Sequence, residues 1–249
     1  MLVALDEWQL QVFLQSQVDM NGRVAGAEAL VRWKHPVKGV ITPGDFIPVA
    51  ESCGLIVPLG DWMMEQVCLL LNDPRVQAQG CGLSINVSTV QFRQPQFVDK
   101  VRDVLQRTGA PAQLLTLEVT ESLLLNDVEG TIRKMVALRA LGVQFALDDF
   151  GTGYSSLAYL MRLPIQEIKL DQAFIHDLAP MSEHSVLVQA LLMVASSKDL
   201  RVVAEGVEQA AQAELLQAWE PSILCQGYLF SRPVLAQDWL LNPQLGMAS

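Results

Sequence analysis

The chain has 249 residues, of which 51% are apolar and 18% charged, and its formal net charge is −10 at pH 7. This composition excludes a disordered chain, and the surplus of acids disfavours binding to a nucleic-acid polymer through a broad basic surface. The longest nearly apolar run, 186–195, has roughly half the length of a membrane span, and no signal-peptide pattern begins the chain. Its four cysteines are widely spaced and form no C-x-x-C motif, which favours a reducing compartment. We therefore expect a cytoplasmic segment without membrane contact.

Eight apolar runs bounded by turn residues predict eight strands. They cover Leu10–Val18, Val24–Val31, Gly82–Val87, Leu114–Val119, Val143–Leu147, Glu167–Leu170, Arg201–Ala204 and Ile223–Leu229. Helical patterns at roughly 61–72, 92–107, 131–141, 184–198 and 208–219 lie between most of these runs. Alternating strands and helices predict parallel pairing, and eight such units close into an α/β barrel.

The first connection differs from the others. Only residues 19–23 separate the first two strands, and they include Asn21-Gly22, a strong signal for a tight hairpin between antiparallel strands. We therefore predict a TIM-like (β/α)8 barrel whose first strand runs antiparallel to the other seven. No linker composition divides the chain, so we expect one domain over residues 1–249, with a core at about 5–235.

Polar side chains stand at or just beyond the ends of most predicted strands. They are Glu28, Asn86, Glu118, Asp148, Asp149, Lys169, Asp171, Glu205, Glu208 and Gln226. The carboxyl ends of parallel strands share one face of a barrel, so these side chains should converge. Crowded carboxylates repel one another, and a bound divalent cation is the usual way to offset their charge. A set of ligands that are all oxygen atoms favours Mg²⁺ or Mn²⁺ over zinc. A lysine beside such a cluster suits the hydrolysis of a phosphate ester.

Several motifs together resemble the EAL domains, bacterial phosphodiesterases that linearise cyclic di-GMP. The resemblance covers about residues 5–235 and keeps the order and spacing of the family's segments. The matching segments are Glu28-Ala29-Leu30-Val31-Arg32-Trp33, Phe46-Ile47-Pro48, Asn86-Val87-Ser88, Glu118-Val119-Thr120-Glu121, Asp148-Asp149-Phe150-Gly151-Thr152-Gly153, Lys169-Leu170-Asp171, Glu205-Gly206-Val207-Glu208 and Gln226-Gly227-Tyr228.

The resemblance implies a role for each matching residue. Lys169 would orient the attacking water, and Glu205 would act as general base, as a ligand of a second metal, or as both. One metal would be held by Glu28, Asn86, Glu118 and Asp148, and a second by Asp148, Asp149 and Glu205. Arg32 would contact a substrate phosphate, and the remaining substrate-binding residues would be Gln15, Leu30, Pro48, Asp171, Glu208 and Gln226.

The same resemblance implies an activity and partners. It implies metal-dependent hydrolysis of cyclic di-GMP to linear 5′-pGpG with one or two Mg²⁺ or Mn²⁺ ions per site. It also implies a homodimer, with sensory domains in the full-length protein, and a loop that couples the site to the dimer contact through Glu121, Phe150, Gly151, Thr152 and Gly153. Two alternatives stay open: a catalytically weak cyclic di-GMP receptor or regulatory interaction domain, and a barrel enzyme acting on another phosphorylated small molecule.

Overall fold

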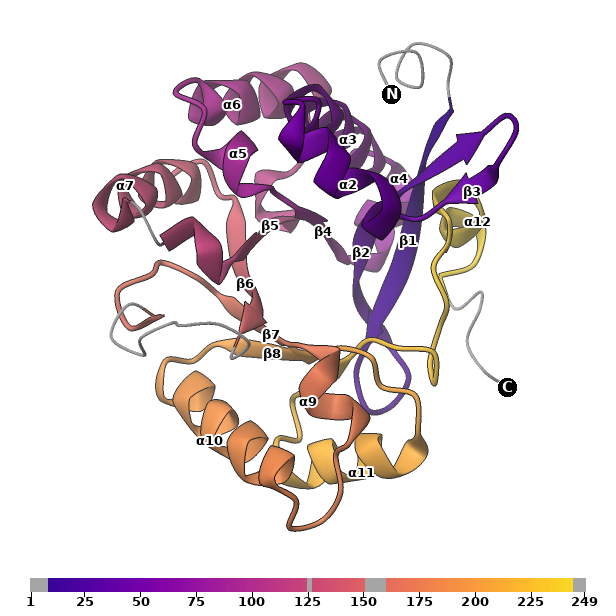
Figure 1. Ribbon diagram of the computed structural model, residues 1–249, viewed down its shortest axis with the longest axis vertical. Coiled ribbons are helices and arrows are strands. Elements are labelled where there is room, and N and C mark those ends of the chain that lie inside the picture. Colours follow the sequence, from indigo (N-terminus) through magenta and orange to yellow (C-terminus); the bar gives the residue numbers. More distant parts are fainter. Residues whose placement is uncertain (1–8, 125–126, 151–159, 244–249) are drawn as a thin grey trace.

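The computed structural model describes residues 9–124, 127–150 and 160–243. Within these ranges the strands belong to one sheet (Figure 1). They are β1 (Leu10–Val18), β2 (Val24–His35), β3 (Gly39–Ile41), β4 (Gly82–Asn86), β5 (Leu115–Thr120), β6 (Gln144–Phe150), β7 (Glu167–Leu170), β8 (Arg201–Ala204), β9 (Leu224–Cys225) and β10 (Val234–Leu235).

The sheet closes on itself because β1 pairs with β2 on one side and with β9 on the other. Both of these pairings are antiparallel, whereas the pairings from β2 through β4, β5, β6, β7 and β8 to β9 are all parallel. β3 and β10 add to the two ends of the strand order outside the barrel. The prediction of an eight-stranded barrel with its first strand reversed is therefore confirmed.

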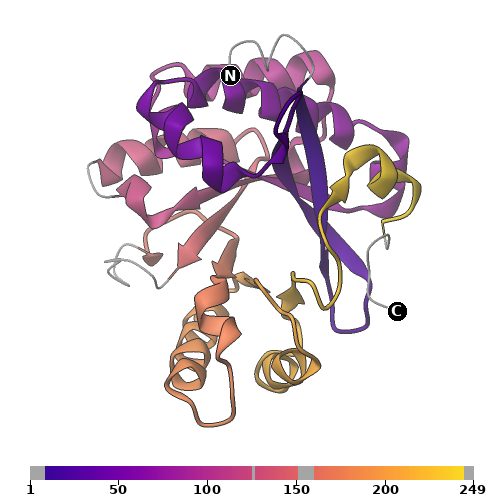
Figure 2. The same ribbon diagram turned by 45° about the vertical axis from the view of Figure 1, so that its right-hand side comes forward.

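Helices surround the strands, as Figures 1 and 2 show. Five of them correspond to predicted helices, with ends displaced by a few residues: α3 (Ile56–Leu71), α6 (Phe97–Thr108), α7 (Val128–Arg139), α10 (Glu183–Ser197) and α11 (Ala210–Trp219). The unpredicted elements are mostly short: α2 (Pro43–Ser52), α4 (Pro74–Gln79), α5 (Thr89–Phe92), α9 (Gln172–His176), α12 (Ala236–Leu241) and the 3-10 turns η1 (Ala112–Leu114) and η2 (Glu121–Leu124). None of the helices in the described ranges has the length and apolar content needed to cross a membrane.

The hairpin between β1 and β2 fixes which residues face each other. Gly22 adopts a positive φ of 74°, and the Asp19 carboxylate accepts hydrogen bonds from the backbone N–H groups of Asn21 (2.8 Å) and Arg23 (2.9 Å). This turn sets a register in which Gln15 lies opposite Glu28. The reversed strand thus places a glutamine beside one of the predicted metal ligands.

The parallel strands carry two kinds of side chain in alternation. In β5, Leu115, Leu117 and Val119 belong to the apolar core, while Thr116 and Glu118 between them are buried polar residues. Successive side chains of a strand point to opposite faces, so the apolar residues pack under the helices and the polar ones point into the barrel. Barrel interiors are usually filled with apolar side chains, so a polar interior marks a site rather than a core.

The last barrel strand is shorter than predicted. The sheet ends at Cys225, not at Leu229, because residues 227–231 form a turn in which Phe230 and Ser231 both donate backbone hydrogen bonds to the carbonyl of Gly227. The backbone N–H of Leu229 donates to the carbonyl of Val207 at 3.0 Å. This turn brings Gln226 over the end of the barrel instead of continuing the strand.

The close contact between Gly227 and Val207 predicts a large effect of Gly227→Ala on stability. A Cβ atom at Gly227 would lie 2.2 Å from the backbone oxygen of Val207 and 2.3 Å from its nitrogen. Backbone atoms cannot rotate away, so we expect the free energy of unfolding in urea to fall by about 1–3 kcal/mol.

Gly44→Ala is the matched control. Gly44 lies in α2, and no heavy atom would stand within 4 Å of an added Cβ. That variant should keep or gain up to about 1 kcal/mol of stability, because alanine favours the helix. Equal unfolding midpoints for Gly227→Ala and wild type would contradict the role given to this contact.

Candidate active site

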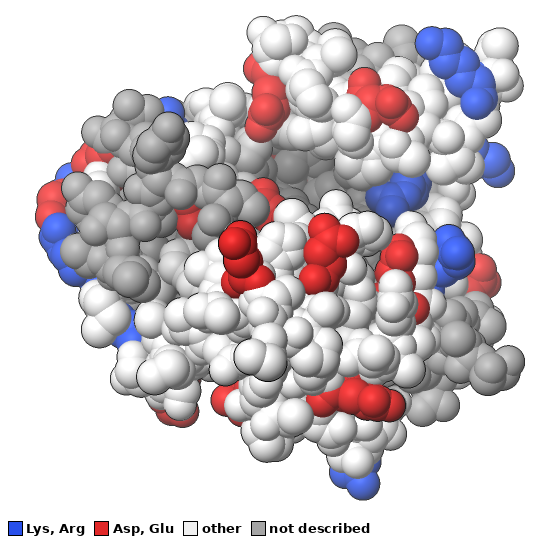
Figure 3. Space-filling view, turned by 60° about the horizontal axis from the view of Figure 1, so that its bottom comes forward, with Lys and Arg blue, Asp and Glu red and all other residues white. Residues whose placement is uncertain are grey.

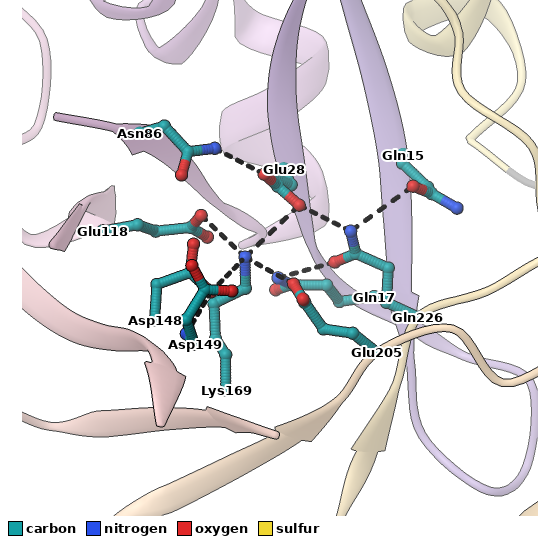
Figure 4. A network of polar contacts seen from close by, with 10 residues as sticks. All are labelled: Gln15, Gln17, Glu28, Asn86, Glu118, Asp148, Asp149, Lys169, Glu205 and Gln226. Atoms are coloured by element: carbon teal, nitrogen blue, oxygen red, sulfur yellow. Dashed lines mark hydrogen bonds and ion pairs between the residues drawn. The ribbon is translucent and has the colours of Figure 1, made fainter. Parts of the chain in front are cut away.

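The ammonium group of Lys169 lies inside a ring of four largely buried carboxylates (Figure 4). The Lys169 side chain is 1% exposed. Its Nζ lies 2.6 Å from Glu205 Oε1, 2.7 Å from Glu118 Oε2, 3.3 Å from Glu28 Oε2 and 3.5 Å from Asp148 Oδ1. These side chains come from β2, β5, β6 and β7 and from the residue after β8. The predicted convergence of strand-end residues is present in the structure.

Amide side chains hold Glu28 in place. Asn86 Nδ2 donates to Glu28 Oε1, and Gln226 Nε2 donates to Glu28 Oε2, both at 2.6 Å. Gln226 also approaches Gln15 Oε1 at 3.4 Å, and it accepts a hydrogen bond of 3.1 Å from Gln17 Nε2. Gln17 was not predicted as a site residue. The signal was present, since Gln17 follows Gln15 by two positions in the same strand and so faces the same side.

Burial and mutual repulsion change the pKa of most acids in the ring. Burial raises the pKa of Glu118 well above its usual range, and it raises the pKa of Asp148 and brings that of Glu205 to about 8. At Glu28 burial acts in the same direction, but attraction to Lys169 and hydrogen bonds from the amides outweigh it and lower the pKa. Burial alone would lower the pKa of Lys169, but the surrounding carboxylates raise it well above normal. A single ammonium therefore does not neutralise this cluster.

The donors present fit a divalent cation. Glu118 Oε1 is buried and accepts no hydrogen bond from the described residues. Carboxylates and the Asn86 amide offer only oxygen, the ligand type of Mg²⁺ and Mn²⁺. Among the described residues no three His, Cys, Asp or Glu side chains already surround a common point as ligands, because the carboxylates face Nζ of Lys169 instead.

Asp149 has an unusual backbone conformation for a residue with a side chain. Its φ is 55°, in the left-handed region, and its backbone N–H donates to Asp148 Oδ1 at 3.1 Å. Burial, followed by repulsion from Asp148 and Asp171, raises the pKa of Asp149 to about 6. Asp171 itself caps α9 by accepting a hydrogen bond of 2.8 Å from Ala173 N. Strained residues of this kind cluster at functional sites.

Leu30 and Pro48, two predicted substrate-binding residues, line the same cavity. It has a volume of about 440 Å³, is also lined by Asn86, and lies between α2, α3 and the ends of β2 and β4. Arg32 is half-buried above Glu28, where its guanidinium donates to the carbonyl of Val31 and stands 5.9 Å from the ring centre of Phe13. An apolar cavity thus lies next to the carboxylate ring.

The other predicted residues lie farther from Lys169. Glu208 is exposed, and its backbone N–H donates to Gln212 Oε1 at 2.9 Å. None of the contacts among the described residues connects Glu208 to the carboxylate ring. Glu121 is buried at the start of η2, and Phe150 is buried at the end of β6. The predicted loop residues Gly151, Thr152 and Gly153 lie outside the described residues.

The distribution of charged side chains on the surface agrees with the net charge of −10 calculated from the sequence. Figure 3 shows a hollowed face on which acidic side chains stand around the hollow and only a few basic ones accompany them. The described residues on this face form no extended basic patch of the kind that polyanion binding requires. A phosphate-bearing ligand therefore needs local partners, such as Arg32, Lys169 or a bound cation.

The fold and the site together define a class of protein, a barrel with one reversed strand and an acidic cluster at the carboxyl ends of its parallel strands. A family model for the EAL domain matches residues 1–233, and this chain belongs to that family.

Two curated relatives come from Pseudomonas aeruginosa. The bifunctional diguanylate cyclase/cyclic di-GMP phosphodiesterase MucR is 41% identical over 244 residues, 96% of this chain and 35% of that protein. The cyclic di-GMP phosphodiesterase NbdA is 40% identical over 233 residues, 93% of this chain and 30% of that protein. The chain thus spans about a third of the length of these relatives. The solved structure of the PaMucR phosphodiesterase in complex with c-di-GMP has a TM-score of 0.88 at 41% identity, covering 94% of this chain and 96% of that one.

The raised pKa of Glu205 predicts that the metal-free protein loses stability as the pH rises from 6 to 8. Folded Glu205 keeps its proton up to about pH 8, whereas an unperturbed glutamate loses it near 4.5. Between these values the folded state binds more protons than the unfolded state, so the free energy of unfolding decreases with pH. We expect a loss on the order of 1–2 kcal/mol in urea titrations with EDTA. Glu205→Gln should flatten this slope, and an equal slope in that variant would contradict the assignment.

Proposed function

We propose that this domain hydrolyses cyclic di-GMP to linear 5′-pGpG with the help of Mg²⁺ or Mn²⁺. The observation that carries the proposal is the ring of Glu28, Glu118, Asp148 and Glu205 around Lys169 at the carboxyl end of the barrel. Membership of the EAL domain family supports it, as do two relatives that are named cyclic di-GMP phosphodiesterases. So does the similarity to a PaMucR structure with c-di-GMP.

We assign the metal ligands as two sets that share Asp148. Glu28, Asn86, Glu118 and Asp148 would hold one ion, and Asp148, Asp149 and Glu205 a second. The buried, unsatisfied Glu118 Oε1 and the raised pKa values of Glu118 and Glu205 support a cation at this position. A divalent cation bound there would lower the pKa of water and offset negative charge on the phosphate.

In this mechanism Glu205 takes part in the proton transfer, and Lys169 positions the attacking water. Glu205 accepts a proton from the attacking water in its ionised form. Without metal, burial keeps Glu205 protonated up to about pH 8, and a cation bound beside it would favour the ionised form. Lys169 donates a hydrogen bond to that water and offsets negative charge on the phosphate. The oxygen of water bonds to phosphorus and the P–O3′ bond breaks. A proton passes to O3′, which leaves a 3′-hydroxyl and a 5′-phosphate.

The remaining predicted residues contact the rest of the substrate. Arg32 would hold a phosphate, and Leu30 and Pro48 flank a base in the cavity that they line. Gln15 and Gln226 would contact the nucleotide from the reversed strand and from the turn after β9. Asp171 supports Asp149 directly, whereas Glu208 reaches the substrate only from the exposed rim.

Incubation of the protein with cyclic di-GMP and Mg²⁺ or Mn²⁺ tests the activity. We expect linear 5′-pGpG by nucleotide chromatography and no product in EDTA. Glu205→Gln should lower kcat by about 10²–10⁴-fold, because it removes the general base. Glu214→Gln, an exposed substitution on α11 that makes the same charge change, is the control and should retain activity.

The receptor alternative has a distinct outcome. Binding of cyclic di-GMP without product under either metal would favour a receptor or regulatory domain over the enzyme. Neither binding nor turnover would favour a barrel enzyme that acts on another phosphorylated molecule.

We also propose that two copies associate through the outer face of α10. Val186, Leu187 and Met193 are 67%, 40% and 74% exposed on this helix, and no charged residue stands between Glu183 and Lys198. Apolar faces of this kind mark protein contacts. Regulation by further domains in a longer protein is likewise a proposal, supported by relatives about three times as long. A cytoplasmic location is a proposal too.

Met193→Glu tests this dimer. Light scattering after size-exclusion chromatography should give a dimer mass for wild type and a monomer mass for the variant, because a buried unpaired charge opposes association. Val136→Glu on α7 is the control, since Val136 is also an exposed apolar residue but lies on another helix. A monomeric wild type, or a Met193→Glu variant that stays dimeric, would contradict the assigned face.

A further inference from the structure

Three buried glutamines form a connected hydrogen-bond network next to Glu28 (Figure 4). Gln226 Nε2 donates to Glu28 Oε2 at 2.6 Å and lies 3.4 Å from Gln15 Oε1. Gln17 Nε2 donates to Gln226 Oε1 at 3.1 Å, and Gln15 Nε2 donates to the carbonyl of Ser231 at 3.0 Å. A buried amide is costly unless it is hydrogen-bonded. These contacts therefore allow three amides to lie inside the barrel beside a carboxylate.

The two ends of this network fix the direction of its hydrogen bonds. An ionised carboxylate and a backbone carbonyl only accept hydrogen bonds. Gln226 must therefore turn its NH₂ group toward Glu28, and Gln15 must turn its own NH₂ group toward Ser231. In this orientation the oxygen of Gln226 points at Gln17, which supplies the matching N–H group. A reversed Gln226 amide would instead place its oxygen against the Glu28 carboxylate, with no hydrogen between them.

The position of Gln17 in the barrel calls for a reason other than packing. Gln17 is 5% exposed and lies opposite Gly26 in the β1–β2 register. An added Cβ at Gly26 would stand 3.1 Å from Gln17 Oε1, so the glycine leaves room for this amide. Interior positions of such barrels usually hold apolar side chains, and methionine could fill this one without burying an amide. The hydrogen bond to Gln226 supplies the reason.

We propose that Gln17 is a positioning residue of the metal site, which holds the Gln226 amide in the orientation that presents an N–H group to Glu28. This inference rests on the proposed function, in which Glu28 is a metal ligand. Groups that hydrogen-bond to a metal ligand orient it, and their loss weakens metal binding typically by about 10–100-fold. Without Gln17 the buried oxygen of Gln226 loses its donor, which favours other orientations of the amide. Gln17 thus acts on the metal site through Gln226.

Gln17→Met tests this role, because it removes the donor and keeps an unbranched side chain of similar length. We expect the Kd for Mn²⁺ without substrate, measured from the electron paramagnetic resonance signal of free Mn²⁺, to rise about tenfold. With cyclic di-GMP, the KM for Mn²⁺ should rise, while kcat at saturating Mn²⁺ should change little. An unchanged Kd for Mn²⁺ in this variant would contradict the role.

Gln144→Met is the matched control. It makes the same change at the amino end of β6, where Gln144 Nε2 donates to the carbonyl of Gln113 at 2.7 Å. This variant should keep the wild-type affinity for Mn²⁺ even where it lowers the free energy of unfolding. Gln17→Asn is a second variant at the tested position, since its amide is one methylene too short to reach Gln226. It should act like Gln17→Met, and it takes over the test if the methionine variant does not fold.

A double-mutant cycle separates positioning from a merely structural role. Gln226→Met removes the N–H group from Glu28 and should weaken Mn²⁺ binding by about 10–100-fold. If Gln17 acts through Gln226, adding Gln17→Met to that variant should cause no further loss of affinity. Losses that simply add would refute this route.

The outcomes also separate this inference from the proposed function. If wild type binds Mn²⁺ and both Gln17 variants bind it equally tightly, the role of Gln17 is refuted while the proposed metal site stands. If wild type binds neither Mn²⁺ nor Mg²⁺, with or without cyclic di-GMP, the proposed metal site fails and this inference fails with it.

Discussion

The attraction between one buried ammonium and four surrounding carboxylates is the interaction on which the site depends. Isolated charges are costly to bury, and Lys169, Glu28 and Glu118 are each almost inaccessible to water. Each ion is tolerated only because the others are held close by strands that share one sheet. The pairing of β4 with β5 places Asn86 beside Glu118, and the pairing of β7 with β8 places Lys169 beside Val203, two residues before Glu205. The barrel therefore fixes the distances that make this cluster possible.

Strand alternation explains how such a polar cluster coexists with a stable core. Ile168 and Leu170 pack on the side of the helices, while Glu167 and Lys169 occupy the interior of the same strand. Glu167 is also buried, with burial raising its pKa and Arg201 acting in the opposite direction. The apolar half of each strand supplies the packing, and the polar half is free to carry chemistry. Stability and function thus reside on opposite faces of the same short strands.

Local signals in the sequence predicted the features that depend on local chemistry. Asn21-Gly22 predicted the hairpin and hence the reversed strand, and polar residues at strand ends predicted the carboxylate ring. What the sequence did not reveal depends on distant partners. The early end of β9 follows from a backbone contact between Gly227 and Val207. No local sequence pattern predicts this contact. One domain over the whole chain stays a prediction.

The reversed first strand also changes where the chain enters the barrel. In an all-parallel barrel the first strand starts at the face opposite the active site, but β1 starts at the catalytic rim, where Leu10 pairs with Trp33 and Gln11 with Arg32. Gln9, immediately before β1, accepts a hydrogen bond of 3.0 Å from Trp33 Nε1, and its carbonyl accepts one of 2.7 Å from Lys34 N. A pull or twist on the segment leading into Leu10 would therefore act first on the residues beside Arg32. The segment by which the chain enters the barrel is thus hydrogen-bonded directly to the part of β2 that carries Arg32.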